Sequence, residues 1–166
     1  QVALDLSGSA RDLRVAGTSS GYLDARLEGE VDPLDADLPA SLKLQSQEFL
    51  PHSSVPETLT LGQWRLELDG SLARGFNTRT RAMLPASTGP VEASVQGLVT
   101  LQGASGVEVS MIARDREGNY EGRFGANGNV SWRDGIDANA DITLDGFPWY
   151  GLIPGLESPP VALNRL

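Results

Sequence analysis

The stretch from Tyr120 to Trp132 reads "YEGRFGANGNVSW", and its alternation decides the fold class. Apolar and small residues occupy the even positions, and polar residues fill most of the odd ones. Successive side chains of a β-strand point to opposite faces of a sheet, so a period of two predicts one dry face and one wet face. We therefore expect one long strand here, with a single apolar side.

The same alternation continues on both sides of this stretch. Val91–Leu101 precedes it, followed by "GASG" at 103–106, where we expect a glycine-rich hairpin turn. A turn at "RDG" leads into the alternating residues 136–144. Further strands are expected at Val2–Leu6, Leu13–Ala16, Leu23–Val31, Leu42–Leu44, Leu59–Leu61, Trp64–Leu72, Phe76–Ala82 and Val107–Ala113. No segment of useful length shows an apolar period of 3.6, which predicts an all-β protein with few or no helices.

Two proline-containing segments interrupt the pattern and are expected to be loops, at about 32–40 and 45–58, the second with room for one helical turn. The chain begins at Gln1 without a methionine or an apolar leader. No run reaches the ~18 consecutive apolar residues of a membrane-spanning helix. We therefore expect residues 1–166 to be a single β-repeat segment, excised from a longer protein.

Composition argues against several classes of function. There are 22 acidic and 13 basic residues, a formal net charge of −9, which repels nucleic-acid phosphates. The absence of cysteine excludes disulfides and thiolate metal sites. His52 is the single histidine, and no G-x-S-x-G motif is present. "DANAD" at 137–141 begins like a calcium loop, but Ile142 stands where that loop needs glycine. We expect no enzyme activity, metal or cofactor.

The apolar stripe remains, and it permits two architectures. Most such stripes form the packed interior of a β-sandwich. Here many inward positions are Ala or Gly, aromatics make up 6% of the chain, and no amphipathic helix is available as a cover. These features favour a curved antiparallel sheet with an open apolar trough. The residues expected to line this groove are Leu66, Leu68, Val95, Val99, Val109, Met111, Phe124, Val130, Trp132, Ile142 and Leu144.

Three motifs carry a resemblance to a known family. These are "LELDGSL" at 66–72, "GNVSWRDGIDANADITLDGFPW" at 128–149 and "LIPGL" at 152–156. In this combination and order the chain resembles the TamB branch of the AsmA-like proteins. The resemblance covers the residues from Leu59 onward, while the first 58 agree only in style.

The resemblance implies a periplasmic protein of a Gram-negative bacterium, anchored in the inner membrane by a helix that this chain does not contain. It implies a partnership with the outer-membrane barrel TamA through another part of the protein. The implied fold is a β-taco, a curved sheet with an apolar hollow. The implied roles are phospholipid transport between the two membranes and support of outer-membrane protein assembly and secretion.

An apolar trough suits phospholipid acyl chains, because each CH₂ kept from water is worth about 0.8 kcal/mol. Two other functions stay open at this point. One is a chaperone-like module whose sheet edges pair with unfolded β-strands. The other is a purely structural β-repeat. An excised sheet should also have a free edge strand, so we expect the chain to form edge-strand dimers.

Overall fold

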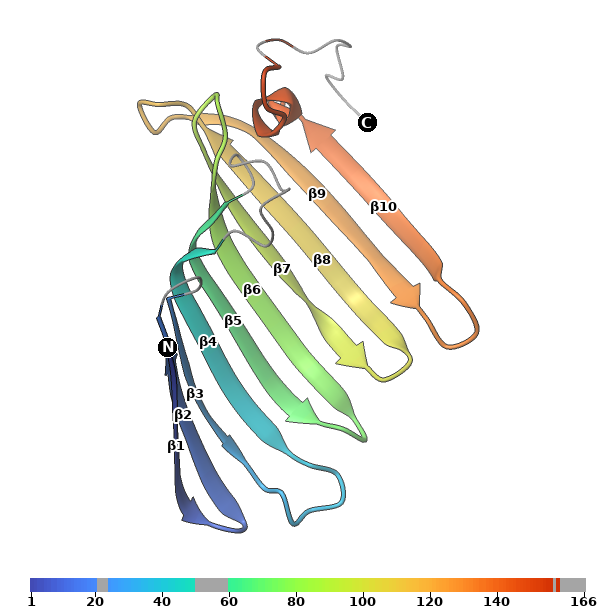
Figure 1. Cartoon of the computed structure of the whole chain (residues 1–166). Coiled ribbons are helices and arrows are strands. Elements are labelled where there is room, and N and C mark those ends of the chain that lie inside the picture. The colour runs from blue at the N-terminus through green and yellow to red at the C-terminus, as the bar shows by residue number, and fades with distance from the viewer. Residues whose placement is uncertain (21–23, 50–59, 157, 159–166) are drawn as a thin grey trace.

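The computed structural model describes residues 1–20, 24–49, 60–156 and 158. Ten antiparallel strands form one sheet, in which every strand lies next to its neighbours in sequence (Figure 1). The sheet is curved and unclosed, with β1 and β10 at its two edges. The described residues contain one short 3₁₀ helix, η2 (Trp149–Leu152), and no α-helix. The predicted all-β, open and curved fold is confirmed.

The strands are mostly long, and short loops join them. Their bounds are β1 (Val2–Ser9), β2 (Asp12–Ser19), β3 (Ala25–Val31), β4 (Ala40–Phe49), β5 (Leu61–Ser71), β6 (Gly75–Pro85), β7 (Pro90–Thr100), β8 (Gly103–Arg114), β9 (Tyr120–Ser131) and β10 (Asp137–Asp145). Because the strands alternate in direction, the loops gather at two rims. Loops after odd-numbered strands form one rim, and loops after even-numbered strands form the other (Figure 1).

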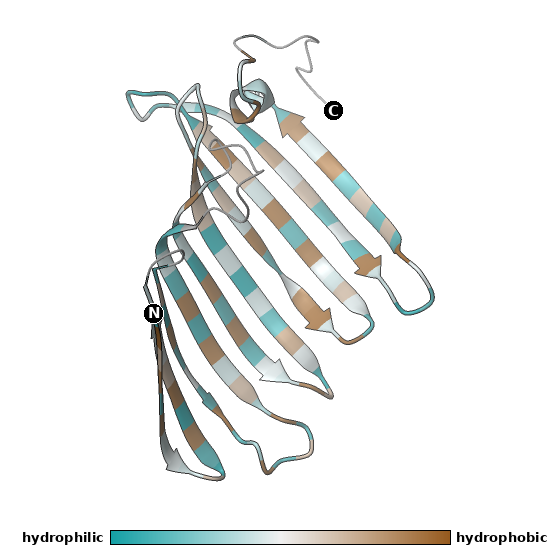
Figure 2. Cartoon of the chain, in the orientation of Figure 1, coloured by the Kyte–Doolittle hydropathy of each residue, from teal (hydrophilic) through white to brown (hydrophobic). Residues whose placement is uncertain are grey.

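Cross-strand register collects the alternating apolar residues on one face of the sheet, which we call the apolar face. Figure 2 shows the resulting bands of hydrophobic and hydrophilic residues along the strands. Directly opposed partners form rows that run from strand to strand. The central row contains Leu4, Gly17, Leu27, Leu44, Leu66, Thr80, Val95, Val109, Ala126 and Ile142. A one-residue slip would turn a strand's whole apolar set to the wet face, so this register is strongly specified.

Two sequence predictions were wrong. Residues 45–49, expected in a loop, form the second half of β4 and pair with β5, with Ser46 opposite Trp64. Ser46 is buried, and its hydroxyl oxygen lies 2.7 Å from each of two carbonyl oxygens, those of Asp24 and Glu48, to which its single proton can donate. These polar residues show no apolar alternation, so the sequence pattern did not predict a strand here. Residues 50–58 of that expected loop, with His52, lie outside the described residues.

The expected turn at "GASG" is instead the start of β8, and the chain turns at Leu101–Gln102. Gly106 has φ +56° and lies at a β-bulge, where the β8–β9 register shifts between Ala104 and Val107. Glycine suits the extra residue of such a bulge because it adopts positive φ without strain. The Thr100 hydroxyl accepts the backbone N–H of Gln102 at 3.2 Å and so supports the real turn.

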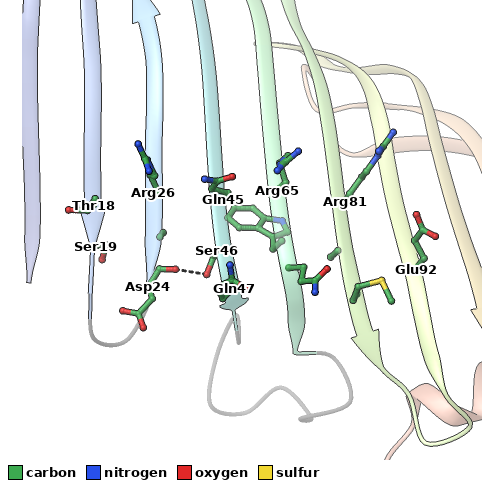
Figure 3. A pocket seen from close by; sticks show the side chains of 15 residues that line it. Thr18, Ser19, Asp24, Arg26, Gln45, Ser46, Gln47, Arg65, Arg81 and Glu92 are labelled. Atoms are coloured by element: carbon green, nitrogen blue, oxygen red, sulfur yellow. Dashed lines mark hydrogen bonds between the residues drawn. The ribbon is translucent and has the colours of Figure 1, made fainter. Parts of the chain in front are cut away.

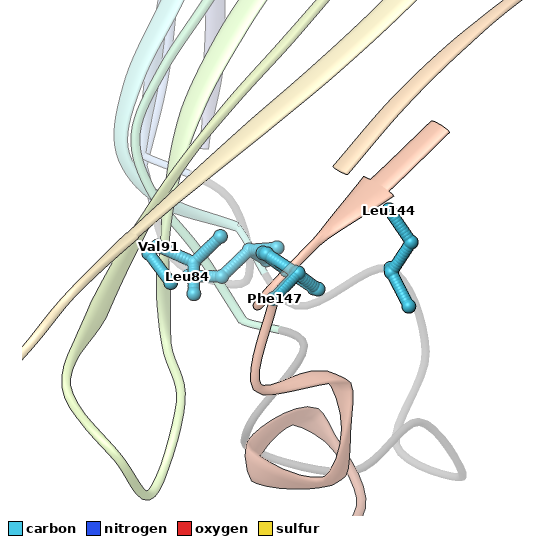
Figure 4. Packing of buried hydrophobic residues seen from close by; sticks show 5 residues of the cluster. Leu84, Val91, Leu144 and Phe147 are labelled. Carbon is cyan, nitrogen blue, oxygen red and sulfur yellow. The ribbon is translucent and has the colours of Figure 1, made fainter. Parts of the chain in front are cut away.

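The residues after β10 fold back over one end of the apolar face. Phe147 joins Leu84, Val91, Ala113 and Leu144 in the buried apolar cluster (Figure 4). Its ring centroid lies 6.2 Å from that of Phe124 on β9. Trp149 and Leu152 of η2 pack against the same cluster. We call this segment, residues 146–156, the cap.

Main-chain contacts attach the cap to the β6–β7 hairpin. The backbone N–H of Ser87 donates to the carbonyl of Gly151 at 2.8 Å. Gly151 is buried, and a Cβ there would lie 2.7 Å from the Thr88 hydroxyl oxygen, so the two segments meet closely. The chain thus passes from the β10 edge to the end of β6 and β7. We call this side of the sheet the capped rim, and the opposite side the open rim.

Candidate functional site

The structure brings ten of the eleven predicted groove residues onto one face of the sheet. Leu66, Val95, Val109 and Ile142 lie in the central row. Leu68 lies one step toward the open rim, Val99 and Val130 lie two steps toward it, and Trp132 follows the end of β9. Met111, Phe124 and Leu144 form a cross-strand set one step toward the capped rim. Whether these residues bind a ligand stays a prediction.

Exposure divides this set. Val95 is 39% exposed and Ile142 is 53% exposed, although both lie on the apolar face. Leu144 is buried in the cluster under the cap, and Met111 and Phe124 pack against that cluster. The protein itself therefore covers the set next to the capped rim, and the described residues leave the central row open.

The three rows from the central row to the open rim are uncharged and, apart from two threonines on β6, apolar or glycine. Their positions on β5 to β10 are Leu66, Leu68, Gly70, Phe76, Thr78, Thr80, Val95, Gly97, Val99, Ala104, Val107, Val109, Ala126, Gly128, Val130, Ala138, Ala140 and Ile142. None of these residues is charged. Exposed contiguous apolar surface of this kind marks a binding surface in soluble proteins.

The opposite face is polar and carries charges that alternate in sign across the strands. Glu28, Lys43, Glu67 and Arg79 follow one another as directly opposed partners from β3 to β6. Two exposed ion pairs lie nearby, Arg26 with Glu28 at 2.6 Å and Arg14 with Glu30 at 3.3 Å. Pairs as exposed as these add at most ~1 kcal/mol each to stability, but opposite charges on neighbouring strands favour the observed register.

A hollow in the described part of the chain does not match the predicted groove. It has a volume of about 720 Å³ and lies toward the capped-rim ends of β2 to β7. Figure 3 shows that neighbouring strands contribute charged and amide side chains to it, including Arg26, Gln45, Arg65, Arg81 and Glu92. Carboxylates and guanidinium groups line it together, so it suits neither an acyl chain nor a strongly charged ligand. We therefore place the candidate site on the apolar face.

One carboxylate among the described residues has a shifted pKa. Asp115, in the β8–β9 hairpin, has a lowered pKa because the Asn119 side chain and the backbone N–H groups of Asn119 and Glu117 donate to its carboxylate. These bonds define a turn, and they leave the carboxylate exposed. Within the described ranges, no group of three His, Cys, Asp or Glu side chains is placed to hold a metal ion. The described residues also include no helix long and apolar enough to cross a membrane.

Together these features define a class of protein: an open, single-layered antiparallel sheet with one continuous apolar face. The family model described as "TamB, N-terminal domain" matches residues 1–159. The chain therefore belongs to the TamB family. Neither the comparison with curated proteins nor the comparison with solved structures returns a match. The family match includes the first 58 residues, which resembled the family only in style.

Sequence reasoning missed two features of the site. It found no element to cover the apolar face, yet the cap covers one rim with Phe147 and Trp149. A signal was present, since three of the ten aromatic residues lie between positions 147 and 150. It also missed the exposed apolar residues in the loops of the open rim, because their partners come from distant parts of the sequence.

Proposed function

We propose that this chain is part of the periplasmic bridge of a translocation and assembly module. In this role its apolar face shelters phospholipid acyl chains in transit between the inner and outer membranes. The observation that carries the proposal is the central row, which crosses ten strands without a charged residue. At about 4.8 Å between strands, this row is roughly 40 Å long. A bilayer core of about 30 Å holds two acyl chains end to end, so one extended acyl chain is about half that length. The acyl chains of one lipid therefore fit along the row with room to move.

The composition of the face suits a carrier better than an enzyme. Each CH₂ group kept from water contributes about 0.8 kcal/mol wherever it lies along such a surface. Aliphatic side chains offer no directional bonds, so a bound chain can slide without losing a specific partner. Family membership supports a transport or assembly role, including support of outer-membrane protein assembly and secretion. A periplasmic location, an inner-membrane anchor and a contact with TamA, the last two through other parts of the protein, belong to this proposal.

The test places a charge on the central row. Val95→Arg should give a folded chain that no longer retains phospholipid, because an unpaired cation covered by bound acyl chains costs several kcal/mol or brings in water. The matched control is Gln96→Arg on the polar face, where the carboxylate of Glu108 is a ready partner. Lipid that co-purifies with each variant is measured by mass spectrometry, and complementation is measured in the full-length protein. Equal lipid retention by Val95→Arg and wild type would refute the proposal.

A second candidate function rests on the two free sheet edges. Among the described strands, β1 and β10 each pair on one side only. An unpaired edge is a template for strand addition, so these edges could receive unfolded outer-membrane β-strands. Proline placed at Leu4 should abolish capture of an extended peptide if β1 is the receiving edge. Peptide capture without any lipid binding would favour this chaperone function over transport.

A further inference from the structure

Large apolar residues are exposed in four successive loops of the open rim. They are Leu34 and Leu38 between β3 and β4, Leu72 between β5 and β6, Leu101 between β7 and β8, and Trp132 and Ile136 between β9 and β10. Their exposed fractions range from 38% to 88%. Single exposed leucines are ordinary, but one in every loop along one rim from β3 to β10 forms a line.

This line continues the apolar face. Leu72, Leu101 and Trp132 each stand two positions after the last apolar-face residue of their strand, Gly70, Val99 and Val130 respectively. Each therefore lies just beyond the end of its strand, next to the last row of the apolar face. Exposed apolar side chains in the loops thus lie next to the open rows of the apolar face.

Hydrogen bonds between neighbouring loops hold the open rim in place. The backbone N–H of Leu72 donates to the carbonyl of Asp37 at 2.7 Å, which joins the β5–β6 hairpin to the β3–β4 loop. Trp132 donates its indole N–H to the Leu101 carbonyl at 2.9 Å and its backbone N–H to the Gln102 carbonyl at 3.0 Å. These bonds join neighbouring loops, and the apolar side chains of those loops are exposed.

The capped rim differs from the open rim in the polarity of its hairpins and in the covering of its apolar surface. Its described hairpins are polar, with Ser87 and Thr88 after β6 and residues 115–119 after β8. The cap packs Phe147 against the ends of β6 to β8 and so occupies the apolar surface there. An acyl chain can therefore reach the open rows over the open rim without displacing a packed side chain, whereas at the ends of β6 to β8 it would have to displace the packed cap.

The charges of the open-rim loops indicate how a ligand is recognised. These loops contain three arginines and four aspartates, so their positive and negative charges nearly balance. The residues are Arg11, Arg74, Arg133, Asp32, Asp35, Asp37 and Asp134. Such a rim has no electrostatic preference for an anionic surface. The remaining source of attraction between the open rim and a ligand is contact between apolar groups. We infer that the open rim is the lateral entrance through which phospholipid acyl chains pass onto the apolar face, an inference that rests on the proposed function.

The test compares loading rates for two sets of exposed residues. The open-rim variant carries Leu72→Gln, Leu101→Gln and Ile136→Gln. The control variant carries Tyr120→Gln and Ile153→Gln, which are also exposed but lie on the capped side. Vesicles of phosphatidylcholine containing a pyrene-labelled phospholipid donate lipid to the purified 166-residue chain, and fluorescence follows the transfer. Circular dichroism checks that each variant is folded.

Loading of the open-rim variant should be at least tenfold slower than wild type, with the amount bound at saturation unchanged. The control should load within twofold of the wild-type rate. If the open-rim variant loads at the wild-type rate, the entrance lies elsewhere while the proposed transport function stands. If wild type takes up no lipid, both proposals fail together.

A second measurement identifies the occupant directly. A photoreactive benzoylphenylalanine replaces Leu101 in one sample and Ile153 in another. A phospholipid adduct at position 101, several-fold more abundant than at position 153, supports the entrance. Crosslinks from position 101 to a second copy of the chain or to another protein, without a lipid adduct, would overturn it.

Discussion

Val91 and Val95 lie on the same strand and the same face, two alternations apart, yet their surroundings are opposite. Val91 is 0% exposed and packs with Leu84 and Phe147 under the cap. Val95 is 39% exposed in the central row. The two valines follow the same sequence pattern, so the pattern alone does not decide whether a position becomes core or open surface. The decision comes from what covers each position, and here the cover is a segment more than fifty residues further along the chain.

The strongest test of this difference places the same charge at both positions. Val91→Arg should prevent stable folding, because an unpaired buried charge costs several kcal/mol against a total stability of about 5–15 kcal/mol. Val95→Arg should cost less than about 1 kcal/mol, because the long side chain can place its guanidinium group in water. Urea denaturation followed by circular dichroism measures both variants. If both substitutions unfold the chain, the whole apolar face is core and the distinction disappears.

The cap can be weakened without adding a charge. Phe147→Ala should lower the free energy of unfolding by about 3 kcal/mol, as expected for removal of a buried phenylalanine ring. The matched control is Ile136→Ala on the open rim, where 88% exposure predicts a change within about 0.5 kcal/mol. Urea midpoints give both values. A larger effect at Ile136 than at Phe147 would mean that the open rim, not the cap, is the covered side.

Most of the sheet was predictable because its signal is local. The alternation in Tyr120–Trp132 or Val91–Leu101 specifies strands and their faces, and short loops make sequential antiparallel pairing the simplest topology. The second half of β4 was not predictable, because Gln45–Ser46–Gln47–Glu48 has no apolar member. Its strand conformation follows from pairing with β5 and from the buried hydroxyl of Ser46.

The site was predictable in its residues but not in its boundaries. The alternation placed Val95, Met111 and Leu144 on one face, as observed, but could not show that the cap covers Leu144. The β7–β8 turn shows the same limit. "GASG" has the composition of a turn, whereas the actual turn at Leu101–Gln102 has its carbonyls bound by Trp132, thirty residues away. Long-range contacts of this kind cannot be predicted from a short segment of the sequence.

A smaller effect is expected from the bonds that order the open rim. Trp132→Phe keeps an aromatic ring but removes the indole N–H that donates to the Leu101 carbonyl. The free carbonyl can bind water at this exposed site. The free energy of unfolding should therefore fall by about 0.5 kcal/mol, the low end for one hydrogen bond. Amide exchange at position 132 should accelerate about twofold. Tyr120→Phe, at the other end of β9, should leave that exchange rate unchanged, and an unchanged rate in Trp132→Phe would show that the indole bond does not order the rim.

The smallest expected effect concerns the β8–β9 hairpin, which lies on the capped side but is not covered by the cap. The Asn119 side chain and nearby N–H groups lower the pKa of Asp115. A carboxyl whose folded pKa is lowered adds stability above its unfolded pKa, and this contribution is lost as the pH falls through the lowered folded value. We therefore expect the hairpin to loosen locally as the pH falls below about 4, while the packing of Phe147 stays intact. The carboxyl carbon shift of Asp115, followed by NMR against pH, measures the pKa. In Asn119→Ala the pKa should rise toward its ordinary value, and an unchanged pKa would show that the hairpin geometry has another origin.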